Sequence, residues 1–531
     1  MGESKQSESG TSQAQDGRIV RLLHRIAAIG NRLPDPVTLF ALIALAVVAA
    51  SWIFAGAEAQ MMMEVEPGEY AMQTITVSSL LTSEGIQWMY LNAIDNFVNF
   101  APLGPVLMVM LGIGIAERTG LITTGLRMLV MSVPKNWITA TLIFSCVMSS
   151  MAADAGYVVM IPLGAMLFAG LGRHPIAGLA AAFAGVSGGF SANLLLTGLD
   201  PMLAELTNEA AQRVGDYDVM VTANYYFLVV STALVTGVGT WVTTKIVEPM
   251  LGDWDPSQAS EPIEEPELPS GSERRNFFIA MGVAGLVTAL IAFLGIWDAS
   301  PLRDLSGEAE STLESLQPYF QRLDVLITLL FFLPGVVFGA LNGTIKNDKD
   351  VADMAAATMA TMGAYVVLAF PAGQFIAFFG KTNLDIYIAD RGVWVLETVG
   401  LQGIPLLIGF LIVSAVINLF IGSASAKWAV MGPVFVPMLM LMGLSPEVVQ
   451  AAYRVGDSVT NIITPLMPYL PIIIVFAKRY VEDIEIGTIL TVMLPYSVAF
   501  GIAWTILLVV WVYLGIPVGP GAEAFIDITG G

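Results

Sequence analysis

The chain has 531 residues, of which 56% are hydrophobic and only 13% are charged, and its mean hydropathy is +0.73. Because soluble domains carry about 25% charged residues, this composition excludes an ordinary soluble protein and indicates a polytopic membrane protein. The net charge of −21 argues against a nucleic-acid partner. A single cysteine, Cys146, excludes an intrachain disulfide, and the two histidines lack the spacing of a zinc site.

Long runs without charge predict where the chain crosses the bilayer. They occupy residues 37–54, 98–116, 276–297, 325–343, 403–421 and 489–515. A run of about 20 apolar residues is long enough to span roughly 30 Å of hydrocarbon. We therefore expect an all-α polytopic membrane protein with about nine transmembrane helices. No cleavable signal precedes the first run, which would serve as its own insertion signal.

Basic residues beside these runs predict the orientation of the chain. The first 36 residues carry five basic side chains, whereas residues 57–96 have acids but no Lys or Arg. The N-terminus is therefore expected in the cytoplasm. The predicted organisation is a cytoplasmic segment at 1–36, the first span and first repeat at 37–249, a flexible acidic cytoplasmic linker at 250–275, linking spans and the second repeat at 276–515, and an external tail at 516–531.

One stretch of the chain occurs twice. Residues 151–195 align without a gap to residues 422–466 at a constant offset of 271, and twelve of these 45 positions are identical. The basic residues around the spans give the two repeats opposite orientations. Inverted repeats with broken hydrophobic segments are typical of transporters that bind their substrate between the repeats. The alternative is an ancient duplication that now serves only as scaffold.

Prolines interrupt the repeated segments at matching positions. Pro162 and Pro175 lie in the first repeat, and Pro433 and Pro446 in the second. We expect re-entrant hairpins or discontinuous helices at these positions. Backbone groups released from helical bonds are tolerated at membrane depth only when they are buried in protein or line a wet cavity.

The second repeat contains the main candidates for substrate binding. Arg454 is permanently charged and its planar guanidinium pairs with carboxylates, so it suggests an anionic substrate. The alternative is a structural ion pair with Asp457, three residues further along the same helix face, and the two roles are compatible. Trp428 offers a stacking surface and one donor to an aromatic substrate, or it is an ordinary core tryptophan.

Polar side chains at nearly equivalent positions of the two repeats are candidates for ion coupling. Their oxygens, beside glycine-loosened backbone, suit Na⁺, with Asn193 and Asn461 at the centre of the two candidate sites. The alternative is ordinary hydrogen bonding between helices. Asp200 would take up a proton readily if desolvated, or would cap a helix at a turn. The candidates are Asp200, Ser187, Ser191, Asn193, Asp457, Ser458, Thr460 and Asn461.

Four stretches, at residues 30–40, 151–195, 418–443 and 446–470, resemble the AbgT family of p-aminobenzoyl-glutamate transporters. The resemblance implies a homodimer in the bacterial inner membrane, with re-entrant hairpins and a basin open to the cytoplasm. It also implies transport of p-aminobenzoyl-glutamate, a folate breakdown product, and for some members export of sulfonamides. The site residues that it implies are Asp200, Ser425, Trp428, Pro446, Arg454, Asp457 and Pro465.

The resulting hypothesis is a secondary active transporter of p-aminobenzoyl-glutamate and of sulfonamide-like aromatic amines, coupled to H⁺ or Na⁺, with no other cofactor and no catalytic residue. The membrane potential opposes entry of an anion by about 2.3 kcal/mol per charge per 100 mV, so import needs coupled cations. One alternative is an intramembrane amide hydrolase acting on the same compound, in which Ser423 or Ser425 would pair with Lys427. An ion channel is a second alternative, which the broken repeats disfavour.

Overall fold

The structure, a computed structural model, describes residues 36–526 apart from 67–68, 102, 132–133, 153–155, 257–258, 260–268, 304–314, 316–318, 320–322, 401, 422, 465–466, 468, 483 and 485. The N-terminal segment, part of the predicted linker and Pro465 of the predicted site therefore lie outside the described residues.

Helices dominate the described chain, as the sequence predicted. The first half contains α2 (Pro36–Ile53), α3 (Ser83–Val98), α4 (Leu103–Arg118), α5 (Leu121–Met131), α6 (Ile138–Met148), α7 (Ile161–Gly170), α8 (Pro175–Phe183), α9 (Leu199–Ala211), α10 (Tyr225–Val242) and α11 (Glu248–Leu251). The second half contains α12 (Gly271–Ile296), α15 (Leu323–Asn342), α16 (Asp348–Thr361), α17 (Gly363–Thr382), α18 (Leu384–Val399), α19 (Gly403–Asn418), α20 (Ala424–Met440), α21 (Pro446–Asn461), α22 (Leu470–Lys478) and α23 (Ile486–Tyr513).

The apolar runs of the sequence coincide with helices. Within the described residues, six helical segments are long and apolar enough to cross a membrane, and shorter apolar helices include α2, α7, α8, α19 and α20. Side-chain caps fix several of the starts, because an oxygen at the N-cap satisfies a free backbone N–H. Asn347 and Asp350 form a capping box at α16, and Ser445 caps α21.

One element was not predicted from the sequence. Strands β1 (Glu58–Glu66) and β2 (Glu69–Thr76) pair antiparallel in the segment that was expected to lie outside the membrane. We call the end of the molecule that carries them the β-ribbon end. Asn383, after α17, donates a hydrogen bond to the carbonyl of Thr76, so this end also includes the end of α17.

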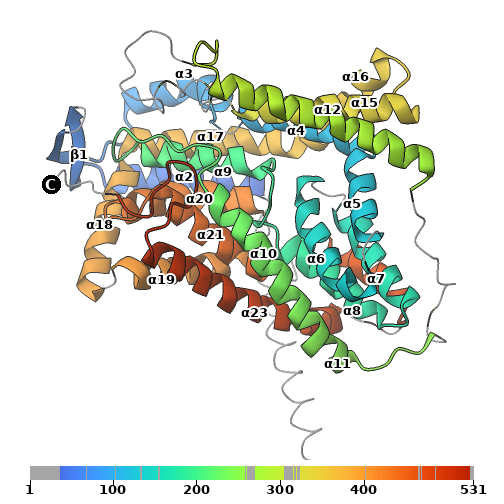
Figure 1. Ribbon diagram of the computed structural model, residues 1–531. Helices are drawn as coiled ribbons and strands as arrows, with labels where there is room; N and C mark the ends of the chain where they lie inside the picture. The colour runs from blue at the N-terminus through green and yellow to red at the C-terminus, as the bar shows by residue number, and fades with distance from the viewer. Residues whose placement is uncertain are drawn as a thin grey trace, which may run out of the picture.

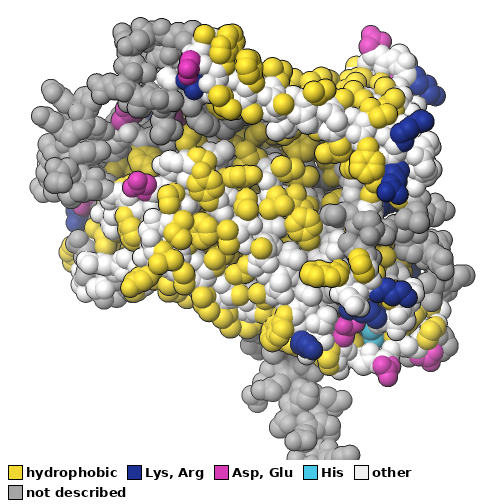
Figure 2. All heavy atoms as spheres, in the orientation of Figure 1, with side chains coloured by type: hydrophobic (Ala, Val, Ile, Leu, Met, Phe, Trp, Pro, Cys, Tyr) yellow, Lys and Arg dark blue, Asp and Glu magenta, His cyan; other side chains and the backbone are white. Residues whose placement is uncertain are grey.

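Figure 1 shows how the helices are arranged. Helices α4, α15 and α12 pack side by side, α17 packs on α2 and α3, and α10 crosses obliquely beside α23. Helices α5 to α8 form a group at the end opposite the β ribbon. In Figure 2 hydrophobic side chains cover the middle of this face, and most Lys and Arg side chains gather near its edges. This distribution fits a surface in contact with lipid between two aqueous layers.

Three of the four repeat prolines lie at or next to helix starts. Pro175 and Pro446 are the first residues of α8 and α21, and Pro162 follows the first residue of α7, after a π-helical turn at Gly156–Met160. The expected break at Pro433 is wrong. Pro433 lies inside α20, which continues to Met440.

The offset of 271 residues recurs in the boundaries of the helices. Helix α8 begins at Pro175 and α21 at Pro446, α9 begins at Leu199 and α22 at Leu470, and α10 ends at Val242 while α23 ends at Tyr513. The similarity of the two halves therefore extends beyond the aligned sequence stretch. Helices α7–α8 and α20–α21 form two equivalent pairs, which we call the first and the second helical hairpin.

Candidate functional site

Helix α21 of the second hairpin contains charged residues and lies in the interior of the protein. Every residue of α21 is buried, including Arg454 and Asp457. Gly456 makes this packing possible, because a Cβ there would lie 2.5 Å from the carbonyl oxygen of Leu411 on α19. Buried charges persist only when they are paired and hydrogen-bonded, so each charge on α21 needs a partner from another element.

Arg454 finds its partner on α9. Its Nη2 lies 2.7 Å from Oδ1 of Asp200, and both side chains are buried. The suggested ion pair between Arg454 and Asp457 is not the one that the structure contains. Asp200 is held in place by its own segment, since its Oδ2 accepts hydrogen bonds from the backbone N–H and the hydroxyl of Thr197.

Asp457 pairs with Lys427 from the other helix of the same hairpin. The Lys427 ammonium donates to Oδ1 of Asp457 and to Oδ1 of Asn418, and its side chain is fully buried. The amide of Asn418 donates in turn to Thr460 (2.9 Å) and to Asn461 (2.8 Å). Oδ2 of Asp457 has no hydrogen-bond partner among the described residues. The two ion pairs together leave the cluster without net charge.

A chain of hydrogen bonds joins Trp428 to Arg454. The indole N–H of Trp428 donates to Oγ1 of Thr207 on α9 (2.9 Å), and Nε2 of Gln450 donates to the same oxygen (2.7 Å). Oε1 of Gln450 accepts from Nε of Arg454 (3.4 Å). Trp428 is fully buried and lies against Tyr453, with 4.5 Å between ring centroids. In this conformation Tyr453 therefore occupies one face of the indole.

The predicted ion-coupling residues lie where the two repeats meet. The backbone N–H of Ser191 donates to the hydroxyl of Ser458, and Asn461 donates to the carbonyl of Ser187. The other predicted Na⁺ ligand, Asn193, donates to Ser150 and accepts from the backbone N–H of Leu195. Both predicted amide oxygens thus already accept a hydrogen bond, at Asn193 from Leu195 and at Asn461 from Asn418.

The site is closed in this conformation. Ser425 borders a cavity of only about 10 Å³, which is too small for a substrate. Pro446, also predicted at the site, starts α21 and is buried. Because Arg454 and Trp428 are also buried, a substrate could reach them only in another conformation.

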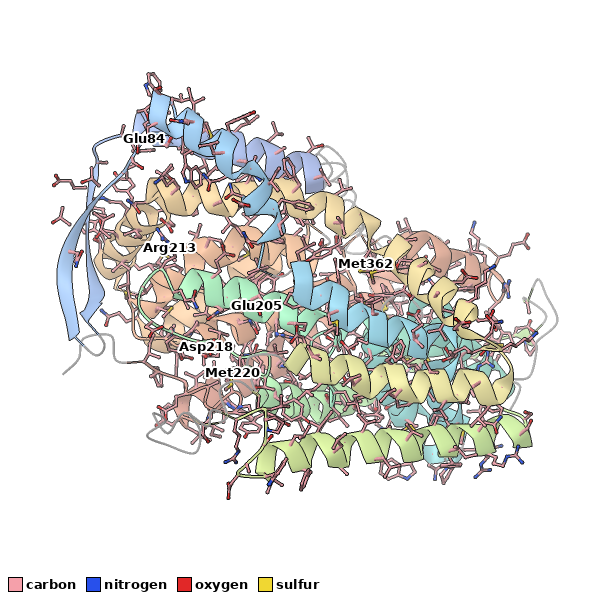
Figure 3. All side chains as sticks on the ribbon, turned by 90° about the horizontal axis from the view of Figure 1, so that it is seen from above. Glu84, Glu205, Arg213, Asp218, Met220 and Met362 are labelled. Atoms are coloured by element: carbon pink, nitrogen blue, oxygen red, sulfur yellow. The ribbon has the colours of Figure 1, made fainter. Side chains whose placement is uncertain are left out.

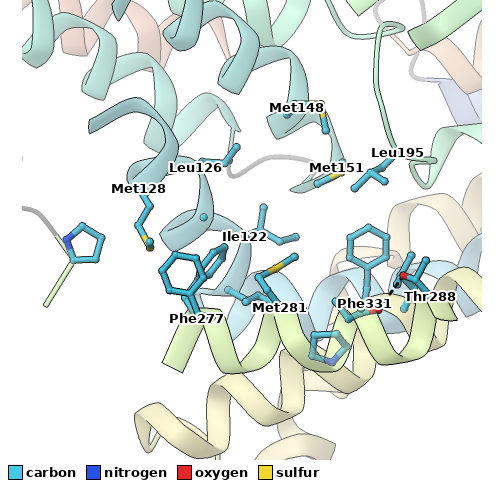
Figure 4. Close-up of a pocket in the computed structure, with 18 of the residues that line it drawn as sticks. Ile122, Leu126, Met128, Met148, Met151, Leu195, Phe277, Met281, Thr288 and Phe331 are labelled. Carbon is cyan, nitrogen blue, oxygen red and sulfur yellow. Dashed lines mark hydrogen bonds between the residues drawn. The ribbon is translucent and has the colours of Figure 1, made fainter. Parts of the chain in front are cut away.

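A much larger cavity, of about 910 Å³, lies between α5, α6, α12 and α15 (Figure 4). Its walls are mostly apolar and include several methionine and phenylalanine side chains, among them Met128, Met281 and Phe331. Leu195 also lines it, two residues from Asn193. Arg274 is the one charged side chain among the lining residues, so most of this wall suits an apolar group.

The serines proposed for hydrolysis lack the arrangement that hydrolysis needs. The hydroxyls of Ser423 and Ser425 contact each other, while Lys427 is bound to Asp457 and Asn418. Residues 185–189 also spell G-x-S-x-G, the pattern of a nucleophile elbow. However, Ser187 lies in a π-helical turn, and the hydroxyl contact that the structure shows is with the sulfur of Met467 at 4.0 Å.

Sequence reasoning found the charged residues but missed the neutral groups that hold them. Asn418, Thr207 and Gln450 were not predicted, although Gln450 lies four residues before Arg454 and so shares its helix face. Nothing in the sequence marked Thr207 as a site residue, because a single threonine on an apolar helix is common. The pairing of Arg454 with Asp200, 254 residues away, had no local signal either.

Comparisons with known proteins agree with the resemblance. Residues 21–526 match the “AbgT putative transporter family”. The chain is 34% identical over 513 residues to the p-aminobenzoyl-glutamate transport protein of Escherichia coli K12, covering 96% of this chain and 97% of that protein.

Two solved structures share the fold. The Alcanivorax borkumensis YdaH transporter, described as having an unusual topology, aligns with a TM-score of 0.83 and 40% identity over 92% of this chain and all of that one. Neisseria gonorrhoeae MtrF, from a class of antimetabolite efflux pumps, aligns with a TM-score of 0.87 and 43% identity over 94% of this chain and all of that one. The relatives are transporters and not enzymes, and the chain is a multi-pass membrane protein that belongs to the AbgT transporter family.

Proposed function

We propose that this protein is a secondary active transporter of p-aminobenzoyl-glutamate in the bacterial inner membrane, working as a homodimer with its N-terminus in the cytoplasm. The observation that carries the proposal is the buried pair between Arg454 and Asp200, joined through Gln450 and Thr207 to Trp428. A guanidinium that already holds one carboxylate is suited to accept another in its place.

The charge balance of the site supports a proton as the coupling ion. Arg454 is neutralised by Asp200, so a substrate carboxylate must compete with this aspartate. Protonation of Asp200 removes its negative charge and releases Arg454 to the incoming anion. Binding of the proton and of the substrate are then linked through one ion pair.

Sodium has weaker support at the residues proposed for it. The amide oxygens of Asn193 and Asn461 each accept a hydrogen bond from an N–H donor. A Na⁺ ion would need several converging oxygens, and each of these two is directed toward a donor. The inverted orientation of the two repeats, inferred from flanking basic residues, supplies the two conformations that either coupling scheme needs.

Sulfonamide-like amines share the aminobenzene ring of the proposed substrate but lack its glutamate. Their binding should depend on the region of Trp428 and on Asp200 more than on Arg454. We propose them as secondary substrates on this chemical ground.

The test is flux into proteoliposomes with Na⁺ and pH gradients imposed separately. We expect labelled p-aminobenzoyl-glutamate to cross intact and to respond to the pH gradient. Asp200→Asn mimics the protonated residue, so it should retain substrate exchange but lose the response to pH. Release of free p-aminobenzoate would indicate hydrolysis and contradict the proposal, and a response to Na⁺ alone would overturn the proton assignment.

A further inference from the structure

A separate cavity of about 570 Å³ lies at the β-ribbon end, between α3, α9, α17 and α20. Small-molecule sites have volumes of roughly 300–1,000 Å³ and combine apolar walls with a few polar groups. The walls of this cavity combine one tryptophan, Trp88, with the charged side chains of Glu209, Arg213, Lys381 and Asp385. We call it the vestibule.

The vestibule lies directly behind the hydrogen-bonded chain of the closed site. Leu206 lines it and is followed by Thr207, which holds the indole of Trp428. Pro433 lines it from α20, five residues after Trp428 on the same helix. The vestibule and the closed site therefore share two helices, α9 and α20.

The two cations of the vestibule are held differently. The Arg213 guanidinium, which Figure 3 labels beyond the end of α9, is fixed by Asp385 (2.5 Å) and by the carbonyl of Gly380 (3.0 Å). The Lys381 ammonium lies 5.6 Å from the centre of the Trp88 ring and forms no ion pair with a described residue. Lys381 is thus the cation that is available to an anionic ligand, beside an aromatic surface.

Glu209 is the unexplained group in this cavity. Its Oε2 is buried and has no hydrogen-bond partner within the described part of the chain. A buried carboxylate oxygen without a donor is unfavourable, so a donor from a ligand would satisfy it. Glu205, four residues before it, and Arg213, four residues after it, act on its charge in opposite directions.

We propose that the vestibule is a second binding site, which takes an aromatic amine that carries a carboxylate. Lys381 binds the carboxylate, Trp88 stacks on the ring, and Glu209 accepts a hydrogen bond from the amine. The inference rests on the proposed function, because p-aminobenzoyl-glutamate is such a molecule. It adds that each protomer holds two substrate molecules, one at the vestibule and one beside Arg454.

The experiment is equilibrium binding of labelled p-aminobenzoyl-glutamate to the purified full-length protein in detergent. We expect two molecules per protomer for the wild type. Lys381→Met and Trp88→Ala should each lose the vestibule molecule and bind one molecule per protomer. The double variant Asp200→Asn/Arg454→Gln, which leaves no unpaired charge, should lose the molecule beside Arg454 and also bind one per protomer. The matched control is Tyr90→Ala, which removes an aromatic ring on the same helix that is 82% exposed and does not line the vestibule; it should keep both.

The outcomes separate the two proposals. One molecule per protomer in the wild type, lost in Asp200→Asn/Arg454→Gln and retained in Lys381→Met, would overturn the vestibule and leave the proposed function intact. No binding in the wild type would overturn the proposed function itself. Because Lys381 is exposed, its variant tests the site even if Trp88→Ala fails to fold.

The role of Glu209 has its own readout. Glu209→Leu, which removes both carboxyl oxygens, should weaken vestibule binding of p-aminobenzoyl-glutamate by about tenfold, the factor expected for one lost hydrogen bond of about 1.4 kcal/mol. It should leave binding of benzoyl-glutamate, which lacks the amine, unchanged. Equal weakening of both ligands would show that Glu209 does not contact the amine.

Discussion

The two helical hairpins share a backbone plan but differ in chemistry. At the offset of 271 residues, Arg454 of the second hairpin corresponds to Phe183 of the first, and Asp457 corresponds to Val186. Helix α8 has no charged residue, whereas α21 has charged residues that are all buried. The two hairpins thus occupy matching places in the chain, while only the second carries the ionic groups. The candidate site is therefore built on the second hairpin and on α9, which supplies Asp200 and Thr207.

The shared packing has a specific cause. Gly185 and Gly456 occupy equivalent positions, and each allows a neighbouring helix to approach closely. A Cβ at Gly185 would lie 2.5 Å from the Cβ of Cys146 and 2.9 Å from the carbonyl oxygen of Ile143. At Gly456 it would lie 2.5 Å from the carbonyl oxygen of Leu411. Thus α6 packs on the first hairpin much as α19 packs on the second.

Removing Arg454 should have the largest effect, because only the second hairpin has a buried charge to lose. Arg454→Ala leaves Asp200 buried and unpaired, which typically costs about 3–5 kcal/mol of stability. Because Arg454 is paired with Asp200 in the interior, this variant is not expected to keep the stability of the wild type. We expect a large drop in thermal stability in detergent together with loss of transport.

A double variant provides the control. Arg454→Ala/Asp200→Ala has no unpaired charge, so it should recover much of the stability but none of the transport. If the single and double variants were equally stable, the pair would not be a buried structural contact. If the double variant transported normally, neither residue would bind substrate.

Alanine at the two equivalent glycines tests the shared packing. Gly185→Ala and Gly456→Ala each force a methyl group against a backbone carbonyl, and overpacking of this kind costs about 1–3 kcal/mol. We expect similar losses of thermal stability for both. Gly282→Ala on α12, where a Cβ meets nothing within 4 Å, is the control and should be neutral. A large loss at only one of the two equivalent glycines would break the equivalence of the hairpins.

Much of this architecture could be predicted from the sequence. Features that depend on neighbouring residues were predicted, and features that depend on contacts between distant segments were not. The apolar runs correctly located α2, α12, α15, α19 and α23. The number of consecutive apolar residues needed to cross a membrane can be read directly from the sequence. The break expected at Pro433 was wrong, since a proline inside a long apolar helix leaves only a few bonds unmade, and neighbouring helices can compensate. The β ribbon was missed because its sequence, with three consecutive methionines at 61–63, does not alternate regularly between apolar and polar residues.

For the site, residue types were easier to predict than partners. Arg454, Trp428 and Asp200 were singled out because charge or a large ring inside a membrane requires an explanation. Asp457, three residues from Arg454, was the nearest local partner, but the structure pairs it with Lys427 and pairs Arg454 with Asp200. Such choices depend on tertiary contacts between distant segments, which one sequence does not reveal.

Trp428→Phe should have a moderate effect. It removes the hydrogen bond to Thr207 but keeps a ring against Tyr453, so we expect a loss of about 0.5–1.5 kcal/mol. The equivalent residue of the first hairpin, Tyr157, stacks on Tyr469 with 4.1 Å between centroids. Because the indole is hydrogen-bonded through Thr207 and Gln450 to Arg454, transport should fall in Trp428→Phe and persist in Tyr157→Phe. Equal transport by both variants would contradict the assignment of Trp428 to the substrate site.

The smallest predicted effect concerns the N-caps that start the second helix of each hairpin. His174 caps α8 through Nδ1, which accepts from the N–H of Ile176 (3.2 Å), and Ser445, at the equivalent position, caps α21 through its hydroxyl. Only the first cap can titrate. His174 lies in the turn between α7 and α8, where burial lowers its pKa from the ordinary 6.5 and the charge of Glu248 partly opposes this shift.

The sign of the pH effect follows from this lowered pKa. As the pH falls through 6.5, the unfolded chain binds a proton at His174 before the folded protein does, so stability decreases and levels off below the folded pKa. A protonated Nδ1 also cannot accept the cap bond, and losing a cap costs about 1 kcal/mol. His174→Ser copies the cap of the second hairpin and should remove this part of the acid sensitivity in thermal unfolding between pH 7.5 and 5. An unchanged pH profile would mean that Glu248, paired with Arg173, and not His174 controls the acid response of the first hairpin.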